Sequence, residues 1–316
     1  FLSLDRERVY QESLYYYPQS GRRLCFRRNR NTGSIIRQQY HFGKGMGPTN
    51  ELYGLAAAAG EETFLFASKD YAIFKEVFSW FTDTLGMIGS DEFPTERFTV
   101  EYAAKHDKMG KVVELLQKAD FPIKEVKFVE KKVTEADLSG VPLSEKMKEE
   151  ILESNFTDMK ISTLHDTPFG NVEFSISEES EGTRKFFSLI GPIIETEDHE
   201  GVIIIDELER SLHPHLVQAI VERFLKSACN CQLIFTTHNT QLLSSGIFRK
   251  DQVWIAEKDN KTGKGSVFSV DDFSNIRDSW DYGKAYLQGR FGGVPFVNLS
   301  GENICSEQEK EHKKDE

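Results

Sequence analysis

The stretch "GVIIIDELERSLHPHL" (residues 201–216) holds four apolar residues in a row, then two acids, then the start of a helix. Four apolar residues without alternation predict a strand buried on both faces of a parallel sheet. Placing Asp206 and Glu207 at the edge of a core is unfavourable unless a cation or strong hydrogen-bond donors meet them. Ligands of such sheets bind beyond the carboxyl ends of the strands, where one carboxylate can hold Mg²⁺ and another can orient water. The alternative is an acidic N-terminus of the helix that begins at Pro214.

A second stretch, "CQLIFTTHN" (residues 231–239), also predicts a buried strand that ends in polar residues. Between the two strands, apolar residues recur at every fourth position from Leu216 to Phe224, which predicts an amphipathic crossover helix. The unit is then β-α-β, with its two strands parallel and adjacent. This arrangement places His238 near the same sheet edge as Glu207. The alternative for a single histidine is a purely structural role.

The segment "SEGT" (residues 180–183) opens an apolar helix about 25 residues before the two acids. A serine at the N-cap, followed by a glycine and exposed backbone N–H groups, is typical of an anion site. The same residues also make an ordinary N-cap. The position of the segment relative to the acids favours the anion site.

Taken in order, "SEGT", "VIIIDE", "SLHP" and "TTHN" resemble the signature motif, Walker B motif, D-loop and switch histidine of ATP-binding-cassette ATPases. More narrowly, "DELERSLHPHL", "QLIFTTHN", "RKDQVWIAEKD" and "YLQGRFGGVP" resemble bacterial abortive-infection and anti-phage defence ATPases. These are relatives of the overcoming-lysogenization-defect and structural-maintenance-of-chromosomes proteins. The resemblance implies an α/β fold: a P-loop, ATP-binding-cassette-like ATPase core. An antiparallel β section near the start and a helical lobe inserted in the middle complete the expected architecture.

The resemblance also implies ATP and Mg²⁺ as ligands, and head-to-tail homodimers or higher homo-oligomers with nucleotides sandwiched between the copies. It assigns roles to eight residues: Asp206 in the magnesium shell, Glu207 at the hydrolytic water, His238 at the γ-phosphate and that water, Ser180, Gly182 and Thr183 at the γ-phosphate held by a second copy, and Ser211 and His213 in the loop between the two sites. Glu207 and His238 are therefore the expected catalytic residues.

The chain departs from the family pattern at the phosphate-binding loop. The Walker A spacing G-x-x-x-x-G-K-[ST] occurs nowhere in the sequence, and "GKGMGPTN" (residues 43–50) does not satisfy it. Because the other motifs are intact, we expect the Walker A segment to precede Phe1. For the Q-loop, Gln39 and Gln117 are candidates by composition only.

Composition restricts the class of protein. The chain has 316 residues with 39% hydrophobic residues, a net charge of −12 and no apolar run long enough to span a membrane. The negative charge disfavours a general affinity for nucleic acid. The basic run from Arg22 to Arg37 is either a local nucleic-acid contact or a solvated strand face. The four cysteines are too scattered for a disulfide framework, which predicts reduced thiols and a cytoplasmic protein.

The predicted organisation has four parts. An N-terminal β section and the start of the ATPase core occupy residues 1–89, and a helical lobe occupies 90–160. The C-terminal half of the core, with the signature, Walker B, D-loop and switch histidine, occupies 161–300. A mixed-charge, mobile tail occupies 301–316.

The expected function is an ATP-binding and ATP-hydrolysing switch subunit of a bacterial anti-phage defence system. Dimerisation around ATP and Mg²⁺ would control an effector, a nuclease or toxin, on a partner chain. Contact with nucleic acid would then be indirect, and no membrane is involved. The alternatives are an ATPase of DNA repair or chromosome maintenance, and a scaffold that holds nucleotide without hydrolysing it.

The glycine-dense segment "YLQGRFGGVP" (residues 286–295) lies beyond the core motifs and carries Arg290. It is either a docking surface for a partner subunit or a loop that packs against the sheet. The sequence slightly favours packing.

Overall fold

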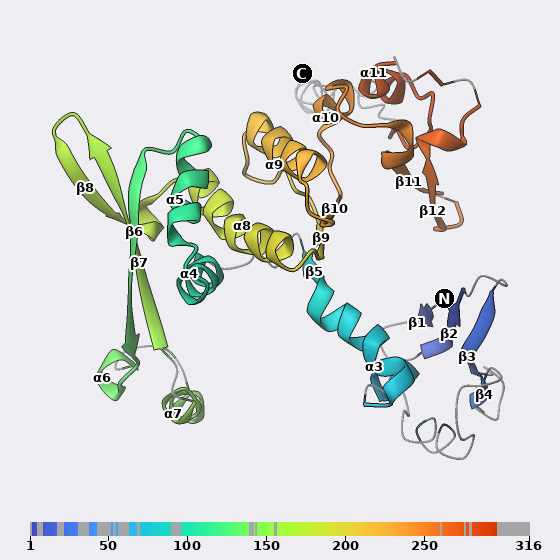
Figure 1. Cartoon of the computed structure of the whole chain (residues 1–316), viewed down its shortest axis with the longest axis horizontal. Coiled ribbons are helices and arrows are strands. Elements are labelled where there is room, and N and C mark those ends of the chain that lie inside the picture. The colour runs from blue at the N-terminus through green and yellow to red at the C-terminus, as the bar shows by residue number, and fades with distance from the viewer. Residues whose placement is uncertain are drawn as a thin grey trace, which may run out of the picture. The chain divides into compact units, whose positions relative to one another are not determined.

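The computed structural model of the chain divides into two compact units. Figure 1 labels their helices and strands. The first contains Phe1–Asp206 and Ser227–Phe235, and the second contains Glu207–Lys226 and Thr236–Glu316. The expected boundaries at residues 90, 161 and 301 remain a prediction, and the predicted tail lies outside the described residues. The structure describes residues 2–4, 9–17, 22–30, 38–42, 52, 55, 63–67, 70–89, 96–138, 142, 144–154, 157–259, 261–274, 276–277 and 280–295.

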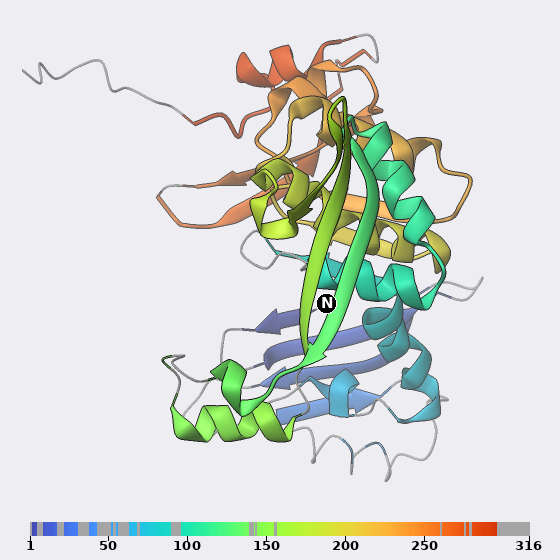
Figure 2. The same cartoon turned by 90° about the vertical axis from the view of Figure 1, so that its left-hand side faces the viewer.

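Four antiparallel strands form a sheet at the start of the first unit, which confirms the predicted β section (Figure 2). In sheet order they are β1 (Leu2–Leu4), β2 (Val9–Tyr16), β3 (Arg23–Arg30) and β4 (Gln38–Phe42). Two short helices, α2 (Phe64–Ala67) and α3 (Ala72–Ser79), complete its core. The buried rings of Phe26, Phe64 and Phe74 meet edge to face, with centroids 4.7–5.7 Å apart. Such aromatic contacts add to the free energy that burial already contributes.

A buried ion pair lies within this core. Arg28 is 0% exposed and Glu12 is 6% exposed, and Arg28 Nη1 lies 3.9 Å from Glu12 Oε2. The two carboxylate oxygens accept the backbone N–H groups of Phe64 and Leu65, at 2.7 and 3.2 Å. Burial raises the pKa of Glu12, although these N–H groups and Arg28 act in the opposite direction. The carboxylate therefore satisfies the first donors of α2, which have no acceptor within the helix.

The basic run from Arg22 to Arg37 has two faces in its described part. Arg27 is exposed and donates to the Tyr15 hydroxyl, and this hydrogen bond lowers the pKa of Tyr15. The Arg22 guanidinium lies 3.6 Å from the centroid of the same ring. These contacts fit a solvated strand face, with the buried Arg28 as the exception. Residues 31–37 lie outside the described part.

The first unit also contains a parallel sheet, in the order β10-β9-β5. Its strands are β5 (Leu85–Ile88), β9 (Val202–Ile205) and β10 (Gln232–Phe235). The prediction that the two motif-bearing strands are parallel neighbours is confirmed, since Val202 pairs with Gln232 and Ile205 with Phe235. The third strand could not be predicted from the local pattern, because residues 74–88 continue the apolar spacing of a helix. The helix ends in a π-turn, η1 (Trp80–Thr84), and the chain then pairs with β9.

The prediction that β9 is buried on both faces is wrong. Ile203 and Ile205 are 1% and 0% exposed, but Ile204 lies on the opposite face and is only half-buried. The register places Met87 and Ile234 beside Ile204, and they are 75% and 46% exposed. Side chains of a strand alternate between the two faces, so a run of four apolar residues does not tell which face is covered.

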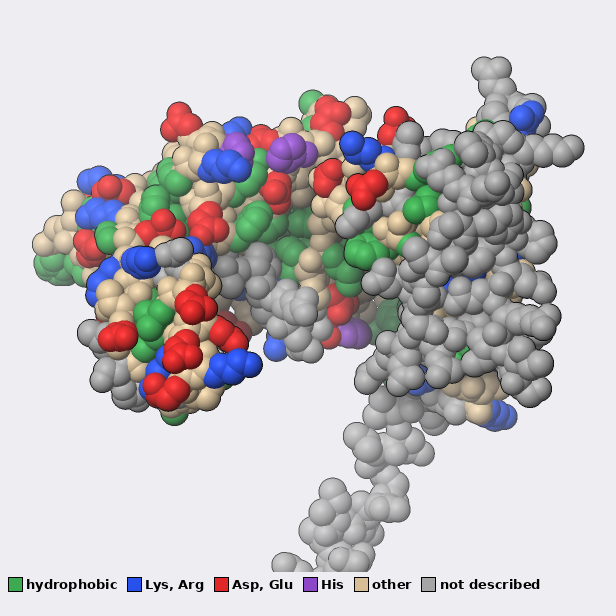
Figure 3. Space-filling view, turned by 90° about the horizontal axis from the view of Figure 1, so that it is seen from below, with side chains coloured by type: hydrophobic (Ala, Val, Ile, Leu, Met, Phe, Trp, Pro, Cys, Tyr) green, Lys and Arg blue, Asp and Glu red, His purple; other side chains and the backbone are tan. Residues whose placement is uncertain are grey.

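The predicted helical lobe is not confirmed, because helices and a three-stranded antiparallel sheet share this part of the chain. Strands β6 and β7 form the long ribbon seen in Figure 1, with β8 beside β7. Exposed ion pairs such as Lys127–Glu173 and Lys131–Asp137 join its elements, and Figure 3 shows acidic and basic side chains side by side. The elements are α4 (Glu96–Lys105), α5 (Met109–Lys118), β6 (Ile123–Lys132), α6 (Glu135–Leu138), α7 (Glu145–Glu153), β7 (Thr157–Thr167), β8 (Gly170–Ser175) and η2 (Ile176–Glu178).

The buried helix α8 (Glu181–Asp198) packs against α4 around a proline. Pro192 has no N–H, so the Ser188 carbonyl loses its usual donor within the helix. The Thr99 hydroxyl of α4 lies 2.9 Å from the Phe187 carbonyl and 3.2 Å from that of Ser188, and it accepts the Gly191 N–H at 3.1 Å. One side chain thus satisfies the interrupted part of α8. Charged residues lie at both ends of α8, and no described helix combines the length and apolar character needed to cross a bilayer.

We expect Gly191→Ala to lower the free energy of unfolding by about 2–4 kcal/mol. A Cβ at this position would lie 2.6 Å from Thr99 Cα and 2.7 Å from Thr99 Oγ1, and backbone cannot move aside cheaply. The control is Gly110→Ala in α5, where an added Cβ meets nothing within 4 Å. Chemical denaturation of both variants measures the difference. Equal stability of the two would mean that α4 and α8 are not packed this closely.

The second unit begins with α9 (Pro214–Lys226), the predicted crossover helix, and α10 (Thr240–Ser244). A two-stranded sheet of β11 (Trp254–Lys258) and β12 (Gly265–Ser269) follows, with α11 (Tyr282–Leu287) and the single turns η3 (Lys250–Gln252) and η4 (Val270–Asp272). Its core contains Val253, Ile255, Val270, Tyr282, Ala285 and Phe291.

The segment 286–295 packs within this core, as the favoured interpretation predicted. Phe291 is 2% exposed, and the Tyr286 hydroxyl donates to the Gly293 carbonyl at 3.0 Å. Gly293 has a φ of +67°, and a Cβ there would lie 2.6 Å from Ile255 Cγ2, so both backbone angle and space require glycine. The Arg290 guanidinium lies 4.8 Å from the Trp280 ring centroid.

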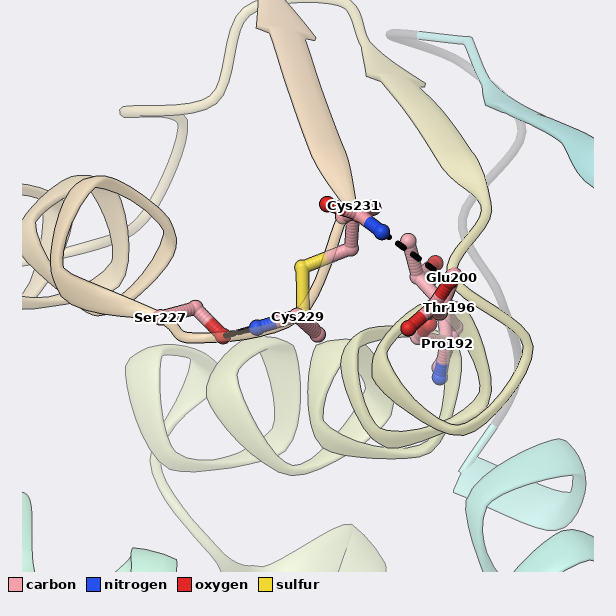
Figure 4. Close-up of a disulfide and its surroundings, with 7 residues drawn as sticks. Pro192, Thr196, Glu200, Ser227, Cys229 and Cys231 are labelled. Atoms are coloured by element: carbon pink, nitrogen blue, oxygen red, sulfur yellow. Dashed lines mark hydrogen bonds between the residues drawn. A yellow bond between two sulfur atoms is a disulfide. The ribbon is translucent and has the colours of Figure 1, made fainter.

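Cys229 and Cys231 form a disulfide in the turn between α9 and β10, which corrects the expectation of reduced thiols (Figure 4). The turn brings their Cα atoms to 5.4 Å, within the range that a disulfide can bridge. Ser227 Oγ accepts the Cys229 N–H, and Asn230 donates to Glu200 next to it. Because the closed loop contains a single residue between the cysteines, the bond constrains only this turn. Cys25 is a buried free thiol.

Candidate functional site

In the first unit, Asp206 directly follows β9 at the carboxyl edge of the parallel sheet. Its backbone N–H donates to the Ile88 carbonyl of β5 at 2.9 Å, and this bond extends the ladder by one residue. The residue is half-buried. No group of three or more potential ligand side chains gathers among the described residues. A single carboxylate fits Mg²⁺, which is usually bound by one or two carboxylates, waters and nucleotide phosphates.

In the second unit, a strained turn begins at Glu207. Glu207 has a φ of +49° and Ser211 a φ of +61°, a region that non-glycine residues rarely adopt. Two hydrogen bonds close the turn, from the Arg210 N–H to the Glu207 carbonyl and from the Leu212 N–H to the Glu209 carbonyl. Such strain persists only where surrounding structure enforces it, and it is concentrated at functional sites.

Three hydrogen bonds join this turn to the segment that carries the predicted switch histidine. The Glu207 N–H donates to Thr236 Oγ1 at 2.9 Å, and the Leu208 N–H donates to the Thr236 carbonyl at 3.2 Å. The His238 N–H donates to Glu209 Oε1 at 2.7 Å. The segments of the acid and the imidazole therefore lie side by side within the second unit. His238 itself is exposed, and Asn239 caps α10 by accepting the Gln241 N–H.

The predicted signature residues form the start of α8. Ser180 is the N-cap, and its hydroxyl accepts the Thr183 N–H at 3.1 Å and lies 2.7 Å from the Thr183 hydroxyl. Ser180 is exposed, Gly182 is half-buried and Thr183 is 4% exposed. The helix is 18 residues long, so its N-terminal N–H groups and dipole favour an anion at this end.

A buried polar cluster anchors the residue before this cap. Glu179 accepts a hydrogen bond from the Thr163 hydroxyl, and its Oε1 lies 2.6 Å from His165 Nε2. Thr163 is 0% exposed, and the side chains of His165 and Glu179 are 14% and 9% exposed. Both partners come from β7, so this strand fixes the position of the signature segment.

The two predicted D-loop residues lie in the turn before α9. Ser211 and His213 are exposed, and the His213 carbonyl accepts the N–H groups of Leu216 and Val217 in the first turn of the helix. The helix begins at Pro214, as predicted.

Residues 1–244 match the protein family described as "AAA domain, putative AbiEii toxin, Type IV TA system". The chain belongs to this family. The match ends within α10, so it contains every predicted site residue, and the segment 286–295 follows it. This finding confirms the resemblance to abortive-infection ATPases of the ATP-binding-cassette type.

The chain is also similar to the "Retron Ec83 probable ATPase" of Escherichia coli, to which it is 28% identical over 102 residues. The matched region covers 29% of this chain and 18% of that protein. The chain therefore corresponds to less than one fifth of the relative's length.

Sequence reasoning missed Glu209, Thr236 and the Glu179 cluster. The only local signal near Glu209 is the run of acids in "DELE". It suggested an acidic start of the helix and not a contact with the histidine segment. Thr236 contacts Glu207 and Leu208, and Glu179 contacts His165. Both contacts join separate segments of the chain, so no local sequence pattern predicts them. Of the Q-loop candidates, the Gln117 amide donates to the Ile123 carbonyl, and the side chain of Gln39 lies outside the described part. The segment 43–50 also lies outside it.

Proposed function

We propose that this protein is an AAA-family ATPase that binds ATP with Mg²⁺ and hydrolyses it slowly. The observation that carries the proposal is the hydrogen-bonded junction between residues 207–209 and 236–238. It holds a carboxylate segment and an imidazole segment together, and in the sequence each follows a strand of the parallel sheet, the kind of position where such sheets carry ligand-binding residues. Phosphoryl transfer to water depends chiefly on such positioning and on electrostatic stabilisation.

Each site residue has a distinct role in the proposed reaction. Bound Mg²⁺ would neutralise phosphate charge, and Asp206 would hold it. Glu207 orients the attacking water or accepts its proton, and the left-handed backbone at Glu207 sets the direction of its side chain. His238 contacts the γ-phosphate and the same water.

The remaining site residues would act across a homodimer. Ser180, Gly182 and Thr183 lie at an N-terminus that favours anions, and they would contact the γ-phosphate held by the second copy. Ser211 and His213 would connect the two sites. ATP then favours the closed dimer, because binding energy is available only in that state. The dimer would control an effector, a nuclease or toxin, in a cytoplasmic anti-phage defence system. Membership of the family and the likeness to a retron ATPase support this setting.

Asp206→Asn tests the proposal through magnesium. We expect phosphate release to fall by about 100-fold and the Mg²⁺ concentration required for half-maximal rate to rise, because a ligand of the ion loses its charge. Glu222→Gln is the control, since Glu222 is paired with Lys226 on α9. Phosphate release is measured at several Mg²⁺ concentrations, together with the mass of the protein in solution with and without ATP. Absence of turnover and of ATP binding in the wild-type protein would contradict the proposal.

A further inference from the structure

Glu209 joins the turn at residues 207–211 to the segment 236–238 through its side chain. Its Oε1 accepts the backbone N–H of His238 at 2.7 Å, across 29 positions of sequence. A hydrogen bond to an ionised acceptor is stronger than one between neutral groups. The bond therefore fixes the main chain at the residue whose side chain is expected to meet the phosphate.

The second oxygen of the same carboxylate makes this contact unusual. Glu209 Oε2 is buried and has no hydrogen-bond partner among the described residues. A buried polar atom without a partner lowers stability, and more so when it carries charge. If position 209 served only stability, a side chain without the unpaired second oxygen would stabilise the fold more than glutamate does. The glutamate therefore points to a geometric role.

We propose that Glu209 is a positioning residue that holds His238 for catalysis. This inference rests on the proposed function, because it assigns His238 to the γ-phosphate. The Glu209 contact and the two bonds to Thr236 are three hydrogen bonds between residues 207–209 and 236–238. Together they restrict the backbone of His238. Glu209 does not touch ATP, and it acts through the histidine. A displacement of about 1 Å at a catalytic group can lower the rate by roughly 100-fold.

Two substitutions separate the hydrogen bond from the charge. Glu209→Gln keeps a side-chain oxygen that can accept the His238 N–H, whereas Glu209→Ala removes it. We expect Glu209→Ala to lower kcat by about 10- to 100-fold with little change in KM for ATP. Glu209→Gln should retain a kcat near that of the wild type. Glu222→Ala, which removes a half-buried carboxylate paired with Lys226 on α9, is the control and should change neither constant.

A second readout follows the hydrogen bond itself. Labelling with ¹⁵N-histidine gives eight backbone amide signals, one for each histidine, and His238→Gln identifies the relevant one. Hydrogen exchange of this amide should be slow in the wild type and in Glu209→Gln, and fast in Glu209→Ala.

The outcomes distinguish this inference from the proposed function. Fast exchange of His238 in the wild type, or equal kcat in Glu209→Ala and wild type, would overturn the positioning role while ATP hydrolysis stands. Loss of activity in Glu209→Gln with slow exchange preserved would also overturn it, because charge and not the hydrogen bond would then matter. A wild-type protein without turnover contradicts the proposed function and the catalytic part of this inference together.

Discussion

The Glu207→Gln variant is expected to release phosphate at least about 100-fold more slowly than the wild type while it still binds ATP. The amide keeps the size of the side chain but cannot accept the proton of the attacking water. ATP binding involves other groups, so the Kd for ATP should change little. With hydrolysis blocked, ATP-bound dimers should accumulate.

Phosphate release and light scattering in the presence of ATP measure these two effects. Glu222→Gln again serves as the control, because it removes one carboxylate from the same unit without altering the turn at residues 207–211. If Glu207→Gln hydrolyses ATP at the wild-type rate, Glu207 is not the catalytic base. If ATP fails to increase the dimer fraction in this variant, the switch interpretation is wrong.

Glu12→Ala is expected to lower the free energy of unfolding by about 3–5 kcal/mol, the largest stability effect in the first unit. The substitution removes the acceptor of the Phe64 and Leu65 N–H groups and the carboxylate beside the fully buried Arg28. Glu76→Ala on α3, at an exposed position, is the control and should cost less than about 0.5 kcal/mol. Chemical denaturation followed by circular dichroism measures both.

The double variant Glu12→Leu/Arg28→Met tests whether the cost arises from an unpaired charge. We expect it to be more stable than Glu12→Ala, because both charges leave the core together. A double variant that loses the sum of the two single losses would show that the two residues act independently.

The pH dependence of Glu12→Ala has a definite sign. Burial raises the pKa of Glu12, so the folded state holds the proton to a higher pH than the unfolded state. The contribution of Glu12 to stability is then fully present below the unfolded pKa and declines as the pH rises through the folded pKa. The stability difference between wild type and Glu12→Ala should therefore be larger at pH 5 than at pH 8. The opposite trend would mean that the Arg28 charge outweighs burial.

Much of the architecture could be predicted from local patterns. The alternation of aromatic and polar residues from residue 1 to about 40 favours antiparallel strands, and unbroken apolar runs predicted β9 and β10. The four-residue spacing from Leu216 to Phe224 predicted the crossover helix, and Pro214 marked its start. These signals are periodicities and caps that a few neighbouring residues produce by themselves.

Other features depended on partners that are distant in the sequence. Leu85–Ile88 continues an apolar helical pattern, and it becomes a strand because β9 offers a parallel edge. The same limit explains why the pairing of β6 with β7, across the helices between them, was missed.

For the site, the sequence by itself determined which residue types follow the strands: Asp206 and Glu207 after one, His238 after the other, and Ser180 at a helix start. Only the tertiary structure decided that Thr236 and Glu209 join the two segments, because hydrogen bonds across 29 residues leave no trace in local periodicity. It also decided the left-handed backbone of Glu207, since that strain is maintained by the surrounding contacts and not by the residue's own preference.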